Sequence, residues 1–130
     1  MTMIWDSVED NEMLSRYIVY KRWVRNDKTV RQDAFMPPPN LQLSVTRQLG
    51  LDDDDIWSFG KLAVLPSGRT LYGRADIKTI QVRKQSLNVQ PAPDLNNPNH
   101  AHIVNWPTNK DEQKMQAMEL ASVSMFLACP

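Results

Sequence analysis

The chain has 130 residues, of which 42% are hydrophobic and 23% are charged, a mixture typical of one folded domain and not of a disordered chain. Fifteen basic and fifteen acidic residues give a net charge of zero, without the basic excess usual in nucleic-acid-binding proteins. The single cysteine, Cys129, cannot form an internal disulfide, and no apolar run reaches the ~18 residues of a membrane span. Residues 1–5 are followed at once by acidic residues, unlike a secretory signal. We therefore expect a single cytoplasmic domain over residues 1–130.

The first third of the chain predicts extended structure broken by turns. Aromatic and β-branched residues between Tyr17 and Val24 favour a strand over residues 16–25. A turn at Asn26–Asp27 then allows a short return strand at Thr29–Arg31. Three consecutive prolines, Pro37–Pro39, indicate a stiff surface connection, with a polyproline ligand for a partner domain as the alternative.

The middle of the chain carries the clearest local signals. Apolar and polar residues alternate strictly over Leu41–Arg47, which predicts a strand with one buried face. The four aspartates Asp52–Asp55 lack the spacing of a calcium loop, so we expect Asp52 to cap a helix that follows. Leu71–Ile77 reads as extended, residues 78–84 as a short ambiguous element, and Leu87–Val89 as a short strand.

The last third predicts a strand followed by a helix. His100–Trp106 reads as the last strand of the sheet, and Pro107 ends it. A capping box that starts at Thr108 opens a helix that runs to about Leu127. The fold class that we expect is α+β, with a small, mainly antiparallel sheet and the C-terminal helix packed on one face.

The two histidines, His100 and His102, are the first candidates for a metal site. On a strand their side chains share one face, which suits two ligands of one ion. A metal also needs a third and usually a fourth ligand, and Asp76 or Asp33 could supply a carboxylate only if the fold brought it close. We therefore expect no metal and no cofactor.

Polar residues within or beside the predicted strands make a second candidate. If Arg47, Arg74 and His100 converged, they would form a pocket for a phosphate or carboxylate. An aspartate that oriented His100 would make it a general base. The candidate polar pocket consists of Asp33, Ser44, Arg47, Arg74, Asp76 and His100.

A third candidate is the basic-aromatic strip from Arg16 to Arg31. It interleaves six basic residues with Tyr17, Tyr20 and Trp23, a composition that suits a nucleic-acid surface. Lysines that protect an exposed sheet edge explain it equally well. Its basic residues are Arg16, Lys21, Arg22, Arg25, Lys28 and Arg31.

Four segments carry a resemblance, and the first of them is the Asp-Ala-Phe-Met-Pro-Pro run at 33–38. The Leu-Ser-Val-Thr-Arg run at 43–47, the Arg-Ala-Asp-Ile run at 74–77 and the His-Ala-His-Ile run at 100–103 resemble the L-S-V-x-R, R-A-D-I and H-A-x-I segments of a group of small uncharacterised bacterial proteins. The similarity extends from about residue 16 onward and brings no activity with it. It places His102 at a variable position of that group, which weakens the metal hypothesis. It implies that the positions to watch are Asp33, Ser44, Arg47, Asp76 and His100.

Three functions remain open at this point. The first is a non-catalytic interaction or binding protein that acts through a protein partner or as a homo-oligomer, because no complete catalytic motif is present. The second is a small enzyme or ligand-binding domain that takes an anionic small molecule around Arg47, Arg74 and His100. The third is a nucleic-acid accessory protein that uses the Arg16–Arg31 strip. The sequence does not decide whether the chain is an enzyme.

Overall fold

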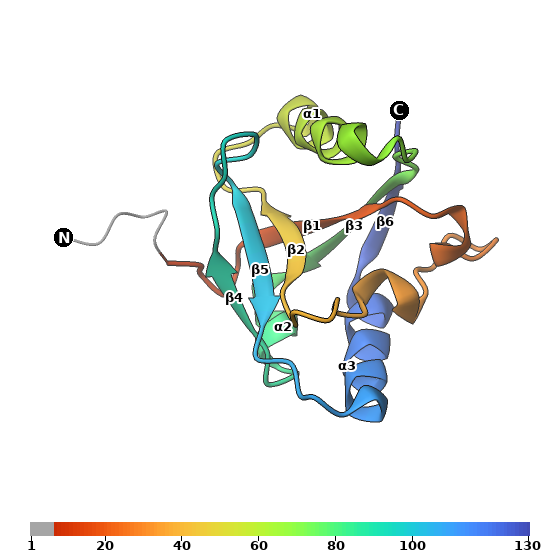
Figure 1. Ribbon diagram of the computed structural model, residues 1–130, viewed down its shortest axis with the longest axis vertical. Coiled ribbons are helices and arrows are strands. Elements are labelled where there is room, and N and C mark those ends of the chain that lie inside the picture. Colours follow the sequence, from red (N-terminus) through yellow and green to blue (C-terminus); the bar gives the residue numbers. More distant parts are fainter. Residues whose placement is uncertain (1–6) are drawn as a thin grey trace.

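The computed structural model describes residues 7–130 and contains one sheet of six strands in the order β4-β5-β2-β1-β3-β6 (Figure 1). Every neighbouring pair is antiparallel. The strands β4 and β6 therefore form the two edges. The six strands are β1 (Met13–Ile18), β2 (Leu43–Arg47), β3 (Gly73–Lys78), β4 (Asn88–Pro91), β5 (His100–Val104) and β6 (Met125–Ala128).

Three α-helices and three short 3₁₀ helices connect the strands. Asp52 caps α1 through its carboxylate, which accepts a hydrogen bond of 2.8 Å from the Asp55 N–H, while the Asp55 carboxylate accepts one from the Asp52 N–H. This is a reciprocal capping box. The helices are α1 (Asp53–Val64), α2 (Thr79–Arg83), α3 (Lys110–Val123), η2 (Lys21–Trp23), η3 (Gln32–Phe35) and η4 (Leu65–Ser67).

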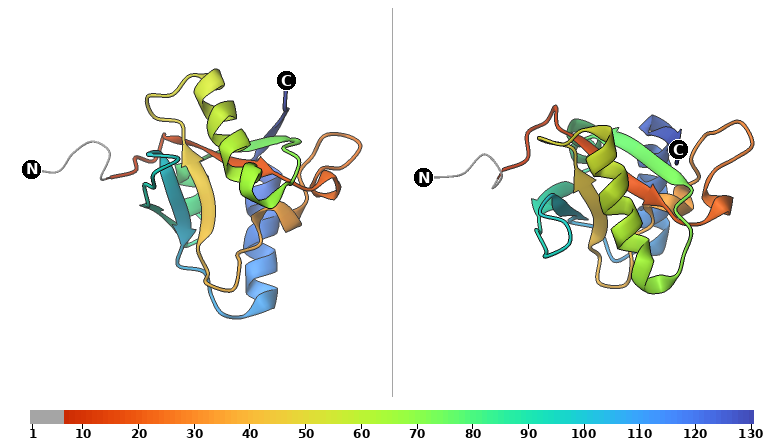
Figure 2. Two further views of the ribbon diagram at one scale, coloured as in Figure 1. Left: turned by 45° about the horizontal axis from the view of Figure 1, so that its top comes forward. Right: turned by 90° about the horizontal axis from the view of Figure 1, so that it is seen from above.

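The two faces of the sheet differ in what covers them. Figure 2 shows α1 lying across one face, with α3 on the other side of the sheet. The face toward α3, here the core face, holds the apolar row of every strand and packs against η3, α2 and α3. The opposite face, here the α1 face, carries more polar side chains. The core face includes Leu14, Ile18, Leu43, Val45, Ala75, Ile77, Val89, Ala101 and Ile103.

Several predictions from the sequence are confirmed. The α+β class, the antiparallel sheet and the C-terminal helix packed on one face are all present. The alternating segment forms β2, and Asp52 caps α1. The ambiguous segment after residue 77 is the short helix α2, in which Val82 is fully buried.

The predicted strand over residues 16–25 is wrong in its bounds. The strand is β1, which ends at Ile18, and Lys21–Trp23 form a 3₁₀ helix instead. The return strand at Thr29–Arg31 is reduced to one isolated bridge between Val24 and Val30. Trp23 is buried in this turn, so its aromatic side chain reflects packing in the core and not strand pairing.

The end of the chain also differs from the prediction. The helix is capped by Asn109, whose side chain accepts hydrogen bonds from the Asp111 and Glu112 N–H groups, and it ends at Val123 and not at Leu127. The next residues form β6, so His100–Val104 is not the last strand. The free edge of β3 explains this outcome, because Gly73 has no side chain and so lets the Leu127 backbone approach closely.

Residues 1–6, where we expected no secretory signal, lie outside the described residues. Over residues 7–130 no helix combines the length and the apolar character needed to cross a membrane.

Candidate functional site

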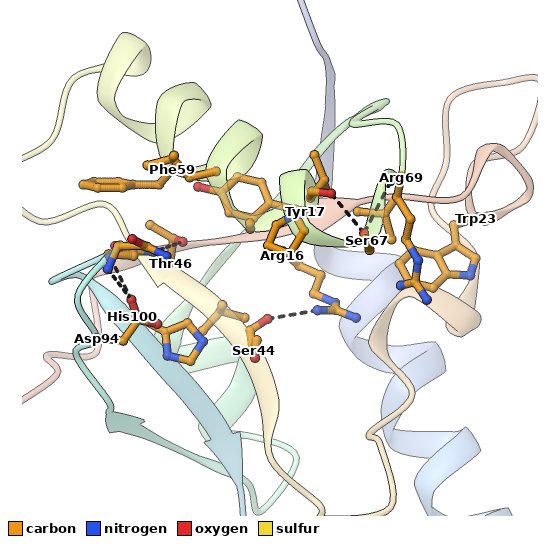
Figure 3. A pocket seen from close by; sticks show the side chains of 18 residues that line it. Arg16, Tyr17, Trp23, Ser44, Thr46, Phe59, Ser67, Arg69, Asp94 and His100 are labelled. Carbon is orange, nitrogen blue, oxygen red and sulfur yellow. Dashed lines mark hydrogen bonds between the residues drawn. The ribbon is translucent and has the colours of Figure 1, made fainter.

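A cleft of about 410 Å³ lies where β1 and β2 diverge. The two strands pair only at Leu14–Arg47 and Ser15–Thr46, whereas β1 and β3 stay paired over all six residues of β1. Beyond Ser15 the ladder between β1 and β2 is not continued. The gap is lined by β1, β2, the C-terminal half of α1 with the turn after it, and the loop before β5 (Figure 3).

Arg16 occupies this gap. Its Nε–H donates to the Ala34 carbonyl at 2.7 Å, and its Nη1–H donates to the Ser44 carbonyl at 3.1 Å, as the dashed line in Figure 3 marks for Ser44. Its guanidinium carbon lies 5.5 Å from the ring centre of Trp23. The side chain therefore links β1 to η3 and β2 at the point where the strands separate.

Within residues 7–130 the charge of Arg16 has no counter-ion. No carboxylate of residues 7–130 forms an ion pair with Arg16. Burial lowers the pKa of Arg16 to about 10, because the guanidinium has lost water without gaining an opposite charge. In the described residues, two carbonyl oxygens and the face of Trp23 replace part of the lost hydration.

The walls of the cleft differ in character. One wall is polar and comes from β2 and β5, with Ser44, Thr46 and His100. The facing wall is largely apolar and comes from the end of α1 and the turn that follows, where Arg69 stands at the rim. The apolar residues of this wall are Phe59, Leu62, Ala63, Val64 and Pro66.

Tyr17 joins the cleft to α1. Its hydroxyl donates to the Ile56 carbonyl at 2.6 Å, and burial raises the pKa of this hydroxyl to about 12. The ring lies directly against Gly60, where an added Cβ would stand 2.7 Å from the Tyr17 Cε1 atom. The absence of a side chain at Gly60 therefore sets how closely α1 can approach the sheet.

The loop before β5 is held in place by asparagines. The Asn97 amide donates to the Thr46 hydroxyl at 2.9 Å, and the Asn99 amide donates to the Arg47 carbonyl at 2.8 Å. His100 places its Nδ1 2.9 Å from the Ala92 carbonyl. A carbonyl oxygen only accepts, so Nδ1 carries a proton and Nε2 is an acceptor in the neutral ring. Figure 3 shows the imidazole between Asp94 and Ser44.

The structure does not bring the three residues of the predicted anion pocket together. Arg47 lies on the core face, where its Nε–H donates to Glu12 at 2.6 Å and its Nη2–H donates both to Glu12 and to the Ser7 carbonyl. Only 3% of the Arg47 side chain and 6% of the Glu12 side chain are exposed. Arg47 is therefore a buried, paired cation that ties β2 to the segment before β1.

Arg74 lies on the opposite face, beneath α1. Its guanidinium donates to Asp76 and, at 2.9 Å, to Asp53 in the first turn of α1, and it stacks 4.7 Å from the ring centre of Trp57. Asp76 also accepts a hydrogen bond of 2.8 Å from the Ser15 hydroxyl. These contacts fasten α1 to the sheet, so the charge of Arg74 is already balanced.

Of the six predicted pocket residues, Ser44 and His100 line the cleft. Asp33 is exposed on η3 and lines a separate surface depression with Arg31. The rings of His100 and His102 meet edge to face at 4.8 Å, and burial, followed by the nearby His100, lowers the pKa of His102. Within residues 7–130 no group of three or more His, Cys, Asp or Glu side chains is arranged to hold a metal ion.

Sequence reasoning placed Arg16 in the basic-aromatic strip and missed its role in the cleft. A signal was present in the spacing of β1, where Leu14, Arg16 and Ile18 share the core face, so a charged residue interrupts an apolar row. Nothing comparable marks Arg69, which reaches the rim from an exposed turn.

The strip itself does not form one surface. Trp23 is buried, and Arg16 points into the cleft. Both Arg22 and Arg69 stack on Tyr20, at 4.5 and 4.9 Å from its ring centre. The aromatic faces that would stack on bases are thus already in contact with arginines.

Comparison with models of protein families, with curated proteins and with solved structures finds no match to this chain.

Proposed function

We propose that this chain is a non-catalytic binding protein that holds a small anionic ligand in the cleft beside Arg16. The observation that carries this proposal is a partly buried guanidinium that lines the cleft and has no carboxylate partner in the described part of the chain. A carboxylate or phosphate on the ligand would supply the missing charge and accept hydrogen bonds from the guanidinium. We assign the protein to the cytoplasm, in keeping with its single cysteine.

The two walls narrow the class of ligand. The polar wall offers the hydroxyl of Ser44 and the imidazole of His100, while the wall from α1 offers apolar side chains such as Phe59 and Leu62. A cleft of about 410 Å³ is within the size range of small-molecule sites. The ligand that fits is an amphipathic anion, with its charged group at Arg16 and its apolar part against α1.

This proposal moves the anion site predicted from the sequence to a different arginine. Arg47 is paired with Glu12, and Arg74 with Asp53 and Asp76, so an anion at either arginine would meet carboxylates that already neutralise the cation. A small ligand also fits better than nucleic acid, because Tyr20 is covered by arginines. Kinship with the bacterial group named above stays a prediction.

The test is a titration of the ¹⁵N-labelled protein with phenyl phosphate and with inorganic phosphate, followed by NMR and calorimetry. We expect phenyl phosphate to bind more tightly, because its ring can bury apolar surface against α1. Shifts of the amide signals should be largest at Ser44 and Asn97. Arg16→Met should weaken binding by about tenfold or more, since a charge-assisted hydrogen bond is lost.

The matched control is Arg31→Met, which removes an exposed arginine that does not line the cleft. Equal affinity in Arg16→Met and Arg31→Met would overturn the proposal, as would shifts spread over the whole basic surface. Affinity for an oligonucleotide that exceeds that for phenyl phosphate and falls steeply with salt would favour the nucleic-acid function instead.

A further inference from the structure

A second surface, which differs from the cleft in composition, is rich in exposed methionine. Met115 and Met118 on α3 and Met125 on β6 are exposed by 68%, 55% and 68%. They line two grooves of about 580 and 620 Å³, and Met118 belongs to both grooves. We call these three residues and the two grooves the methionine surface.

The charges beside the two grooves have opposite signs. The groove along α3 has Glu112 and Glu119 in its lining, whereas the groove near β6 has Arg25 and Lys28 from the loop after η2. Figure 1 shows this loop on the same side of the molecule as α3 and β6. No ion pair within residues 7–130 involves any of these four residues. The methionine surface therefore joins a groove with acidic side chains to a groove with basic side chains, here its acidic and basic ends, and Met118 lines both.

Such a surface is complementary to itself. When two copies meet about a two-fold axis through the middle of the surface, the acidic end of one copy faces the basic end of the other, and methionine packs on methionine. A partner protein of unrelated charge pattern would gain only one of these contacts. The net charge of zero adds no overall repulsion between copies.

The edge strand next to this surface supports the same conclusion. β6 forms the outer edge of the sheet, and Met125 belongs both to β6 and to the methionine surface. The residues of β6 are Met, Phe, Leu and Ala, without the charge or proline that usually protects an exposed edge. An apolar edge strand beside exposed methionines is a surface whose burial against a partner would be favourable.

We propose that the methionine surface binds a second copy of this chain, in a two-fold arrangement that pairs Glu119 of each copy with Arg25 of the other. This contact is independent of the ligand cleft, because the two sites have no lining residue in common. Met118, which lines both grooves, lies near the axis.

The test is sedimentation velocity of the complete chain over a wide range of concentrations. Wild-type protein should sediment as a dimer at high concentration. Glu119→Arg alone and Arg25→Glu alone should each weaken the dimer by about tenfold or more, because each creates two like-charge contacts across the axis. A one-to-one mixture of these two variants should dimerise as the wild type does, since every contact in the mixed dimer is again between opposite charges.

The control is Lys114→Glu, a charge reversal on an exposed α3 residue that lines neither groove, and it should leave the dimer unchanged. Circular dichroism and thermal melting establish that each variant is folded. Met118→Asp should give a folded monomer. A wild-type monomer at all concentrations would overturn the proposal, and so would a dimer that the mixed variants fail to restore.

Discussion

Arg47 and Arg16 lie on the core face of adjacent strands, yet their surroundings are opposite. Arg47 sits where β1 and β2 are still paired, and Glu12 neutralises it at 2.6 Å. Arg16 sits where the strands have separated, and its guanidinium donates to two carbonyl oxygens and lies over Trp23, with no ion pair to any carboxylate of residues 7–130. The comparison teaches that a cation in a strand is structural or available to a ligand according to whether the fold brings a carboxylate to it.

Removing the two arginines should have different effects on the free energy of unfolding. A buried pair contributes little net stability, but removal of one partner leaves the other charge buried and unpaired. An unpaired cation, in contrast, already carries its desolvation cost in the folded state. Stability measurements should therefore respond strongly at Arg47, while binding measurements should respond at Arg16.

The largest expected effect is that of Arg47→Met. This change leaves the Glu12 carboxylate buried without its counter-ion, and we expect a loss of about 3–5 kcal/mol in the free energy of unfolding, measured by urea denaturation. Arg16→Met should cost about 1 kcal/mol, because the lost hydrogen bonds are offset by removal of an unpaired charge. Similar losses in the two variants would refute the distinction between the two arginines.

An intermediate effect is expected for Gly60→Ala, which changes the wall of the cleft without touching a charge. The new methyl group would lie 2.7 Å from the Tyr17 ring and 3.0 Å from Leu71 Cδ2, so α1 must move outward. We expect a loss of about 1–3 kcal/mol in stability, although alanine is the better helix former. Ser58→Ala, at an exposed position of α1, is the control and should be neutral or slightly stabilising. A stabilised Gly60→Ala variant would show that α1 does not press on Tyr17.

The smallest expected effect is on the pH dependence of stability. Burial, with the nearby His100, lowers the pKa of His102 below its ordinary value of 6.5 in the folded state. On acidification the unfolded chain binds this proton first, so stability falls as the pH drops below about 6.5 and is retained above it. His102→Gln should flatten that slope between pH 7 and 5 in urea denaturation. An unchanged slope would mean that His102 does not contribute to it.

Local signals in the sequence were sufficient where the structure depends on neighbours in the chain. The alternation of Leu43 and Val45 and the cap at Asp52 each act within a few residues, and both were predictable. The strand β6 was not, because its apolar residues also continue the helical pattern of α3. The choice between helix and strand there depends on the free edge of β3, which lies far away in the sequence.

The site was less predictable than the fold for the same reason. Glu12 and Arg47 are 35 positions apart, and the local sequence around either residue does not predict their ion pair. Ser44 and His100 were predicted as polar residues on strands, and both line the cleft, which exists only because β1 and β2 diverge. Arg16 could have been singled out from the apolar row of Leu14 and Ile18, whereas its lack of a carboxylate partner is a property of the folded chain alone.

The guanidinium of Arg16 lines an open cleft and has no carboxylate partner within residues 7–130. The choice of buffer anion should therefore affect the measured stability of this protein. A buffer anion that occupies the site beside Arg16 binds only the folded state and therefore raises the melting temperature by mass action. Phosphate should then protect the wild type more than a cationic buffer such as Tris at the same ionic strength. If the proposed anion site exists, melting temperatures measured in phosphate and in Tris should therefore not be compared directly.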